Sequence, residues 1–299
     1  MPQKMMIVDK EPADLRRLER LFGPTYQVLC ATSGEEALAQ IRGHIARGDF
    51  GSRFLLFARP AALRVLPLEE LVRVVEREPA LAAVVLRAAN EGLRAEEATM
   101  SLYVACARIG ADTLRDLIRR RSASVRRSHE AEALRGHSRR CAAAAMLLAE
   151  RTGALDPDEA YTAGLLHDLG EALLRSLFPE EAENITWLGH PFTAEKEVAA
   201  FGVDHAQVGQ WILDACHVPA TLSFAVQAHH DIDHVNGPAA LLLQVADAVA
   251  IANDSSEMAS LDALTPDRFA LLRLTRADLA RVHEMTTEMV GERFDSVAA

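Results

Sequence analysis

The chain has 299 residues, of which 49% are hydrophobic and 25% charged, so it can bury a large core in one or two domains and is not a disordered chain. Its net charge of −11 argues against a nucleic-acid-binding protein, because such proteins usually carry a basic face. Only 5% of the residues are aromatic, while Ala, Leu, Val, Glu and Arg dominate, which favours helices over sheets.

The sequence is typical of a cytoplasmic protein with no membrane partner. Its four cysteines lie far apart and form no CxxC pair: Cys30, Cys106, Cys141 and Cys216. We therefore expect a reducing compartment and neither a zinc ribbon nor a disulfide framework. The N-terminus becomes acidic too early for a signal peptide. The longest nearly apolar run, Pro238 to Ala252, contains polar residues and is too short to span a bilayer.

The first 60 residues combine strand and helix patterns. Short apolar runs predict strands at Met5 to Val8 and at Tyr26 to Ala31. A helical spacing of leucines predicts a helix over Asp14 to Phe22, and Ser33 is a suitable cap for a second helix over Gly34 to Ile41. The segment is therefore expected to form a small β-α-β-α unit.

This unit resembles the opening of a response-regulator receiver domain, through the phrases Ile7 to Pro12 and Ala31 to Leu38. Receivers hold magnesium with two acidic residues after the first strand, and Lys10 replaces the second of them here. The run Phe54 to Phe57 is the only candidate for the third strand, and it lacks the carboxylate that accepts the phosphoryl group. We expect residues 1–60 to be a truncated receiver remnant that cannot be phosphorylated. An independent αβ cap on the main domain is the alternative.

From Pro60 onward the hydrophobic periodicity is helical. The first four helices are expected at Leu68 to Arg77, Ala80 to Asn90, Ser101 to Ile109 and Asp112 to Arg121. Glu78 precedes Pro79 and should end the first helix, while Gly110 separates the last two. The basic run Arg119 to Arg127 is interpreted as a solvated linker, with docking of an anionic partner as the alternative. It has no interleaved aromatic residues, so we expect no nucleic-acid partner.

Five apolar helices between residues 131 and 252 carry histidines and aspartates. The candidate metal ligands are His137, His167, Asp168, His205, His229, His230 and Asp247. Burying imidazole and carboxylate groups is costly unless each is paired, hydrogen-bonded or bound to a metal. This donor set suits a divalent transition metal (Mn, Fe, Zn, Ni or Co) rather than calcium. Because no cysteine belongs to the set, a structural zinc site is not expected.

The pair His167–Asp168 is the centre of this set, in the run Gly164 to Leu174 (GLLHDLGEALL). We place the pair on a helix that begins at Asp156 and Pro157. Neighbouring side chains on a helix lie about 100° apart, so one ion beside the helix can reach both. The alternative is a hydrogen-bonded core histidine next to an aspartate that caps a helix.

Phrases in this order resemble the HDOD family, a branch of the HD superfamily of metal-dependent phosphohydrolases. They are Glu76 to Asn90, Gly136 to Ser138, Ala163 to Gly170, Phe201 to Gly209, Ala228 to His230 and Ala246 to Ala248. The resemblance covers about residues 65–255 and implies a mainly α protein, an HD-like helical bundle of HDOD type. The expected parts after the receiver-like αβ segment are an N-terminal helical half (61–128), an HD-like core (129–255) and C-terminal helices (256–299).

The resemblance implies a non-enzymatic regulator of bacterial signal transduction that acts through protein–protein contacts. The catalytic HD-GYP relatives have a lysine directly after their HDxG phrase and a GYP phrase beyond the paired histidines. Here Glu171 occupies the lysine position and no GYP follows His230. A glutamate at that position repels a phosphoryl anion. The expected partners are signalling proteins or a second copy of the chain.

Two other functions remain open. One is a metal-dependent phosphohydrolase that acts on a cyclic dinucleotide or a nucleotide. The other is a sensor that binds a nucleotide in the same pocket without turnover. After residue 255 we expect helices at Pro266 to Leu272 and Arg276 to Phe294. The second carries an apolar stripe (Leu279, Val282, Met285 and Met289) that either packs on the bundle or serves a partner.

Overall fold

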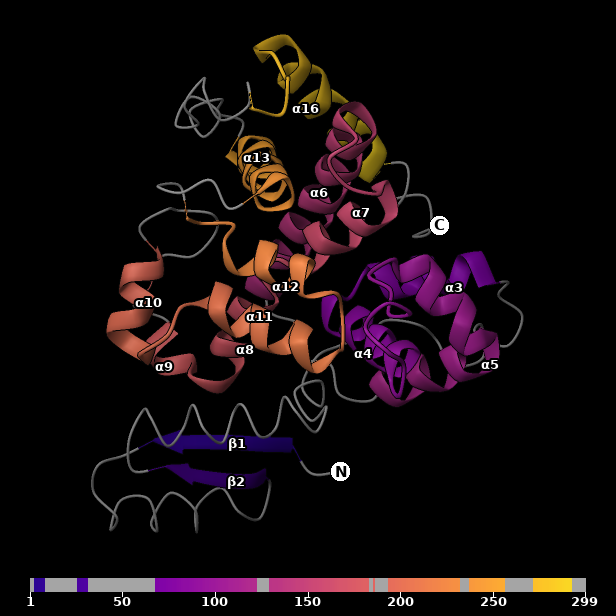
Figure 1. The fold of residues 1–299 in the computed structure, drawn as a ribbon. Helices are drawn as coiled ribbons and strands as arrows, with labels where there is room; N and C mark the ends of the chain where they lie inside the picture. Colours follow the sequence, from indigo (N-terminus) through magenta and orange to yellow (C-terminus); the bar gives the residue numbers. More distant parts are fainter. Residues whose placement is uncertain are drawn as a thin grey trace.

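Helices dominate the computed structural model (Figure 1). It describes residues 3–8, 26–31, 68–122, 129–182, 185, 193–231, 237–255 and 271–291. Among these residues, no helix combines the length and the apolar character needed to cross a membrane.

The two strands expected near the N-terminus are present. β1 (Gln3–Val8) and β2 (Tyr26–Ala31) pair in parallel, and the register runs from Gln3 opposite Tyr26 to Val8 opposite Ala31. The helices expected at 14–22 and 34–41 and the run 54–57 lie outside the described residues, as does most of the helix expected at 266–272. The receiver resemblance of residues 1–60 therefore stays a prediction.

In the described part of the expected N-terminal half, residues 68–122, there are three helices: α3 (Leu68–Glu76), α4 (Pro79–Asn90) and α5 (Leu102–Ser122). Pro79 starts α4, where its missing N–H costs nothing because the first-turn N–H groups have no helical partner. The two helices expected on either side of Gly110 are present and share the label α5; they meet at a kink where Gly110 has φ +78° and ψ 159°, outside the helical region. That backbone conformation is accessible to glycine at little cost.

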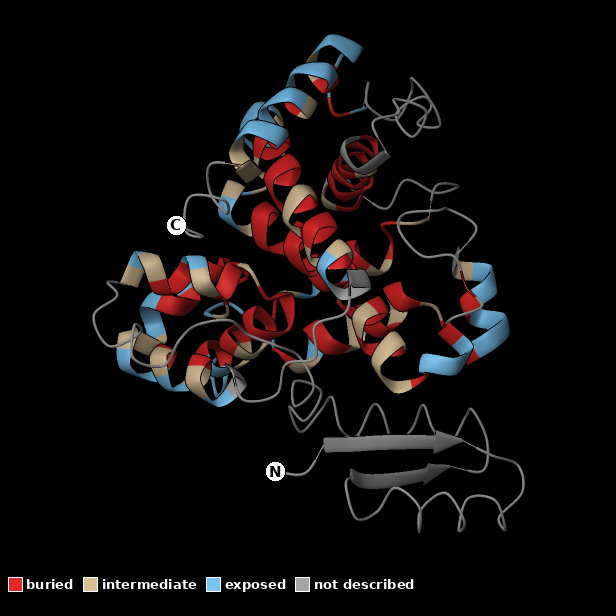
Figure 2. Ribbon diagram, turned by 180° about the vertical axis from the view of Figure 1, so that it is seen from behind, coloured by how far each residue is buried: buried red, intermediate tan, exposed pale blue. Residues whose placement is uncertain are grey.

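A second layer is built on the long helix α6 (His129–Thr152). It packs against α7 (Pro157–Leu166), α13 (Pro238–Ser255) and α16 (Arg276–Val290). The contact between α6 and α7 is unusually close. A Cβ at Gly164 would lie 2.7 Å from the carbonyl oxygen of Cys141, so only glycine fits there. Figure 2 shows buried residues along α13 and along the side of α6 that faces it.

The remaining helices are α8 (Leu169–Leu177), α9 (Pro179–Ala182), α10 (Thr193–Phe201), α11 (His205–Ala215) and α12 (Ala220–Gln227). α11 packs between α8 and α12. Gly170 permits this packing, because a Cβ there would overlap the backbone carbonyl of His205 and approach the Gly209 nitrogen to 2.8 Å. The glycine of the HDLG phrase thus sets the distance between Asp168 and His205.

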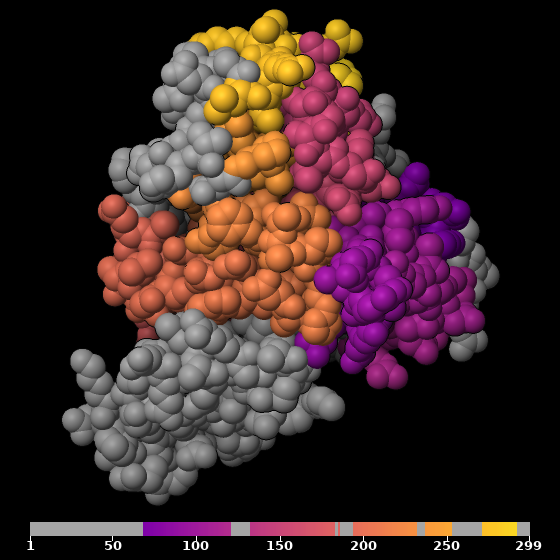
Figure 3. Space-filling model, in the orientation of Figure 1, coloured from indigo at the N-terminus to yellow at the C-terminus, as the bar shows by residue number. Residues whose placement is uncertain are grey.

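The N-terminal half lies against α11, and Figure 3 shows it beside the segment that carries α11 and α12. Asn90 lies at this junction and is fully buried. Its amide donates to the carbonyls of Thr99 (2.9 Å) and Cys216 (3.3 Å). Its side-chain oxygen accepts from the Thr99 N–H (2.9 Å) and from Arg108 (3.3 Å). Of these four bonds, the one to Cys216 joins the two halves, while those to Thr99 and Arg108 lie within the N-terminal half; we call this cluster the Asn90 node.

The C-terminal helix packs on the bundle. In α16, Leu279 and Val282 are buried, and Met289 packs against the core. Met285 remains 39% exposed. Three of the four apolar residues of the stripe therefore pack on the bundle, and only Met285 is exposed.

Candidate metal centre

All seven candidate ligands converge at one point in the helical core. His137 comes from α6, His167 and Asp168 from the turn between α7 and α8, His205 from the first residue of α11, His229 and His230 from the turn after α12, and Asp247 from α13. Six of them are at most 6% exposed, and His230 is half-buried. Residues more than 100 positions apart in the chain thus share one buried polar site.

His167 and Asp168 do not lie within a helix, contrary to the prediction. α7 ends at Leu166, and Asp168 has φ −97° and ψ 16°, outside the helical region. Asp168 stands at the N-cap position of α8 but makes no capping hydrogen bond. The alternative of a helix-capping aspartate is therefore wrong as well, because this carboxylate faces the histidines instead.

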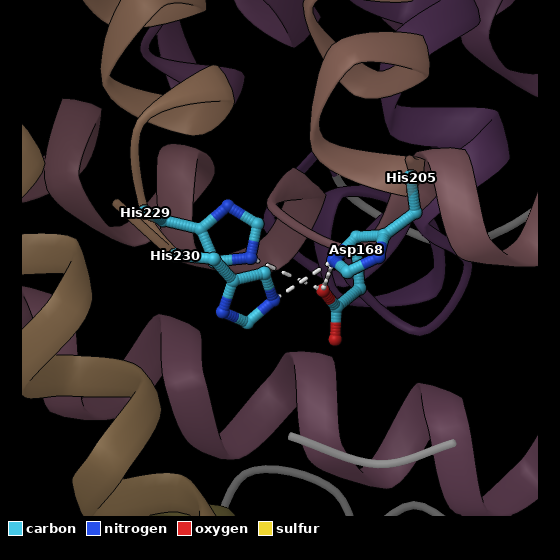
Figure 4. A group of neighbouring side chains, drawn as sticks. All are labelled: Asp168, His205, His229 and His230. Atoms are coloured by element: carbon cyan, nitrogen blue, oxygen red, sulfur yellow. Dashed lines mark hydrogen bonds and ion pairs between the residues drawn. The ribbon is translucent and has the colours of Figure 1, made fainter. Parts of the chain in front are cut away.

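The ligands form two groups, and Asp168 lies between them. In the first group, the donor atoms of His137, His167 and Asp247 all lie within 4.8 Å of one another. The same limit holds for the second group of Asp168, His205, His229 and His230. Figure 4 shows the second group, with the rings of the three histidines around the Asp168 carboxylate.

Each carboxylate oxygen of Asp168 faces a different group. Its Oδ2 lies 3.1 Å from His167 Nε2 and 3.5 Å from His137 Nε2. Its Oδ1 lies 3.4 Å from His205 Nε2 and 3.5 Å from His229 Nε2. One oxygen of Asp168 would therefore be available to a cation in each group, provided that the carboxylate is unprotonated.

Asp247 serves the first group alone. Its Oδ1 lies 3.0 Å from His137 Nε2 and 3.6 Å from His167 Nε2. The first group thus combines two imidazoles with two carboxylates when Asp168 is included. The second combines three imidazoles with one.

Backbone carbonyls set the tautomers of two histidines. His167 Nδ1 donates to the Gly164 carbonyl at 2.7 Å, and His229 Nδ1 donates to the Val226 carbonyl. In a neutral imidazole this leaves the lone pair on Nε2, which points into the site. In the described part of the chain, the buried Nε2 atoms of His167 and His229 make no hydrogen bond. Both atoms are oriented as metal ligands are, with the outer nitrogen held by an acceptor.

A third histidine is held by a carboxylate. Glu197 of α10 is fully buried and accepts from His205 Nδ1 at 2.8 Å and from the His205 backbone N–H at 2.7 Å. His205 Nε2 lies 2.9 Å from His230 Nε2. The sequence analysis did not identify Glu197 as a site residue. A glutamate eight residues before a candidate ligand, across the turn at Gly202, was the available signal.

His137, His167 and His205 favour protonation when no metal is bound. Burial opposes a charge on His205, but its hydrogen bonds to Asp168 and Glu197 outweigh burial and raise its pKa well above the ordinary value. Asp247 and Asp168 raise the pKa of His137 in the same way against the effect of burial. Positive charge, as protons or as metal ions, is therefore required by the carboxylates at the centre.

The other groups follow the same logic. Burial alone would raise the pKa of Asp168, but the positive charge of His167 and the other neighbouring histidines lowers it well below its ordinary value. Histidine partners likewise lower the pKa of Asp247 against burial. His230 differs, because burial and the neighbouring imidazoles lower its pKa and keep it neutral. A neutral imidazole is the form that binds a metal.

The donor set fits a divalent transition metal. Imidazole lone pairs and carboxylate oxygens point at the same space, and they repel one another unless a cation lies between them. Imidazole with carboxylate suits Mn, Fe, Zn, Ni or Co. The four first-group ligands, counting Asp168, would hold one ion, and the four second-group ligands would hold another.

Glu171 is a further buried acid beside this site. It is 2% exposed and pairs with Arg175, whose Nε lies 2.9 Å from Glu171 Oε1. Burial, followed by the negative charge of Asp168, raises the pKa of Glu171 to about 7. The residue at the lysine position of HD-GYP proteins is thus engaged in its own ion pair.

Solved structures of other proteins have a similar fold. The crystal structure of the MmoQ response regulator from Methylococcus capsulatus strain Bath is similar, with 24% identity, a TM-score of 0.61, and coverage of 75% of this chain and 94% of that one. A virulence factor from Campylobacter jejuni is similar at 14% identity and a TM-score of 0.51, covering 83% and 98%. These likenesses show a shared fold. No curated protein matches the sequence.

The family is shown by the sequence itself. The HDOD domain model matches residues 63–232, which is more than half of the chain. The match begins after the receiver-like segment and ends before Asp247. The chain belongs to the HDOD domain family.

Proposed function

We propose that this protein is a non-enzymatic bacterial signalling regulator whose HDOD domain binds divalent transition metal and acts through protein–protein contacts. The observation that carries the proposal is Glu171, a buried acid next to an otherwise complete set of metal ligands. The ligands support metal binding, and Glu171 argues against turnover of a phosphate ester.

Glu171 opposes phosphoryl chemistry for an electrostatic reason. Phosphoryl transfer needs positive charge near the phosphate oxygens, where negative charge develops. Helix α8 places Glu171 beside the site. Arg175, on the same helix, is paired with Glu171. A phosphate approaching the Asp168 side of the site would meet both carboxylates.

Metal at this site would stabilise the fold on which the contacts depend. A ligand that binds only the folded state at 100 times its Kd adds about 2.7 kcal/mol of stability. Loss of the ion would leave the carboxylates of Asp168 and Asp247 to be balanced by protonated histidines. We infer that a signalling protein or a second copy of the chain binds the surface of the metal-stabilised fold.

A metal-dependent phosphohydrolase is the second candidate, and the position of Asp168 between the two ligand groups favours it. Two divalent ions, when bound, would supply Lewis-acid chemistry toward a phosphoryl group. The substrate class would be a cyclic dinucleotide or a nucleotide. Binding of a nucleotide without turnover is the weaker variant of the same idea.

One experiment separates these functions. The protein is purified anaerobically with Mn and Fe, its metal content is measured, and it is incubated with cyclic di-GMP. We expect bound metal, no hydrolysis, and association with a partner or a second copy by light scattering and an interaction screen. Hydrolysis that disappears in Asp168→Ala would replace the regulator with the phosphohydrolase. A protein that is metal-free, monomeric and bound to no partner in the screen would contradict the proposal.

The truncated receiver remnant at residues 1–60 is retained as part of this proposal. The resemblance of Ile7 to Pro12 supports it, together with the parallel pairing of β1 and β2. A segment without a phosphoryl acceptor would present the HDOD domain constitutively. Incubation with acetyl phosphate should therefore leave the mass of the intact protein unchanged.

A further inference from the structure

The second ligand group has an outer partner of a different kind from the first. His167 and His229 are anchored through Nδ1 by backbone carbonyls of their own helices. His205 has no such carbonyl, because it is the first residue of α11 and follows the Asp204 cap. Its Nδ1 is held instead by Glu197, a side chain from the preceding helix.

Glu197 is buried, whereas its near neighbours on α10 are exposed. The helix exposes Glu195, Lys196 and Val198, whereas Glu197 is 0% exposed. Both of its oxygens lie within 2.9 Å of His205 Nδ1, and one also accepts the His205 backbone N–H. Burying a carboxylate completely is costly unless strong donors compensate it. Here the compensating donors belong to one candidate ligand.

We propose that Glu197 is the positioning residue of the second ligand group, which holds the His205 ring so that Nε2 faces Asp168 and His230. The proposal rests on the proposed metal binding for its consequence, but the orientation itself exists without metal. A carboxylate acceptor makes Nδ1 the protonated nitrogen and increases the basicity of Nε2. Glu197 does not contact the ion and acts through His205.

The contact also links α10 to the site. The same carboxylate fixes the first backbone N–H of α11, so Glu197 determines both the ring and the start of the helix that carries it. Gly170 of α8 packs against the backbone carbonyl of that same residue. His205 is thus held between α8 and α10, and loss of Glu197 frees one of these two restraints.

The test compares Glu197→Gln and Glu197→Ala with Glu195→Gln as the matched control. Glu195 lies on the same helix two residues earlier and is exposed. The first readout is the His205 tautomer in the metal-free, ¹⁵N-labelled protein by NMR, recorded at a pH above the raised pKa of His205, where the ring is neutral. We expect His205 to carry its proton on Nδ1 in the wild type and in Glu195→Gln, to lose this preference in Glu197→Ala, and to keep part of it in Glu197→Gln, which retains one acceptor oxygen.

The second readout is metal affinity by titration with Mn. Removing an outer partner typically weakens metal affinity 10–100-fold. We expect that loss for one of two ions in Glu197→Ala, a smaller loss in Glu197→Gln, which keeps one acceptor oxygen, and none in Glu195→Gln. If Glu197→Ala does not fold, Glu197→Gln decides the result.

The outcomes separate the two proposals. A wild-type protein that binds no metal would remove the proposed metal binding, and the tautomer would still decide the role of Glu197. An unchanged His205 tautomer in Glu197→Gln and Glu197→Ala would overturn the positioning role. Equal metal affinity of these variants and the wild type would overturn it too, even with metal bound.

Discussion

The Asn90 node and the metal centre are both buried polar clusters, but only one of them is complete. At Asn90 each amide donor has a carbonyl acceptor, and the side-chain oxygen has two donors. At the centre, the Nε2 atoms of His167 and His229 make no hydrogen bond and face carboxylate oxygens. A complete cluster holds a fold together. An incomplete one, rich in lone pairs, is prepared for a cation.

The largest effect should come from Asp168→Ala, which removes the carboxylate common to both groups. We expect loss of both metal ions and a fall of about 3–5 kcal/mol in the free energy of unfolding, because breaking a buried ion pair leaves its partners uncompensated. Metal analysis and urea unfolding measure the two effects.

Asp168→Asn is the matched control, since it keeps the volume and removes the charge. It should retain the fold better than Asp168→Ala and still lose the metal. Full metal content in Asp168→Asn would show that the carboxylate is not a ligand, and the centre would then be a polar core like the Asn90 node.

Gly170→Ala should be next in size. Its Cβ would overlap the backbone carbonyl of His205, so α11 must move away from α8. Overpacking of this kind costs about 3 kcal/mol. We expect lower stability in urea and weaker metal binding together, because His205 moves with α11.

Gly136→Ala is the comparison for this substitution. It adds the same methyl group one residue before His137, where only the flexible end of Arg140 lies near, at 3.3 Å. Its stability should stay within about 1 kcal/mol of the wild type. Equal behaviour of the two alanine variants would refute the close packing of α8 on α11.

Asn90→Ala tests the complete cluster. It leaves the buried Thr99 N–H without its acceptor, which costs about 2 kcal/mol. Metal stoichiometry should not change, because the Asn90 node contributes no ligand. Glu91→Ala, at the exposed neighbouring position, should have no effect on unfolding by urea. Loss of metal in Asn90→Ala would mean that the two clusters are not independent.

The pH dependence of stability should show the smallest effect. His137, His167 and His205 have folded-state pKa values raised above 6.5, so their contribution is fully present below about pH 6.5 and is lost as the pH rises through those values. The lowered pKa of His230 opposes this in part. We expect the free energy of unfolding of the metal-free protein to fall between pH 6 and pH 8.

The aspartates act at the other end of the pH range. Asp168 and Asp247 have lowered pKa values, so their contribution is present above about pH 3.8 and is lost as the pH falls through the folded-state values. Metal should reverse the trend near neutrality, because it needs unprotonated ligands. Thermal unfolding against pH, with and without Mn, measures both curves. Parallel curves would contradict a metal bound by these histidines.

Much of the helical architecture was predictable from the sequence, for local reasons. Pro79 marks the start of α4 and Gly153 (φ +66°) the end of α6. Asp156 caps α7 by accepting from the N–H groups of the two residues after Pro157. Signals of this kind depend on a few neighbouring residues, so the sequence carries them directly. The helix break at His167 and Asp168 has no such signal, and the prediction there was wrong.

The sequence by itself determined which residues are available for a site: seven histidines and aspartates in or next to apolar helices, in phrases that resemble the HDOD family. Only the tertiary structure decided that Asp168 lies between two groups, that Glu197 holds His205, and that Glu171 is paired with Arg175. The physical reason is that burial, tautomer and pairing are properties of the packed helices. They depend on which backbone atoms approach each side chain, and residues distant in the chain supply those atoms.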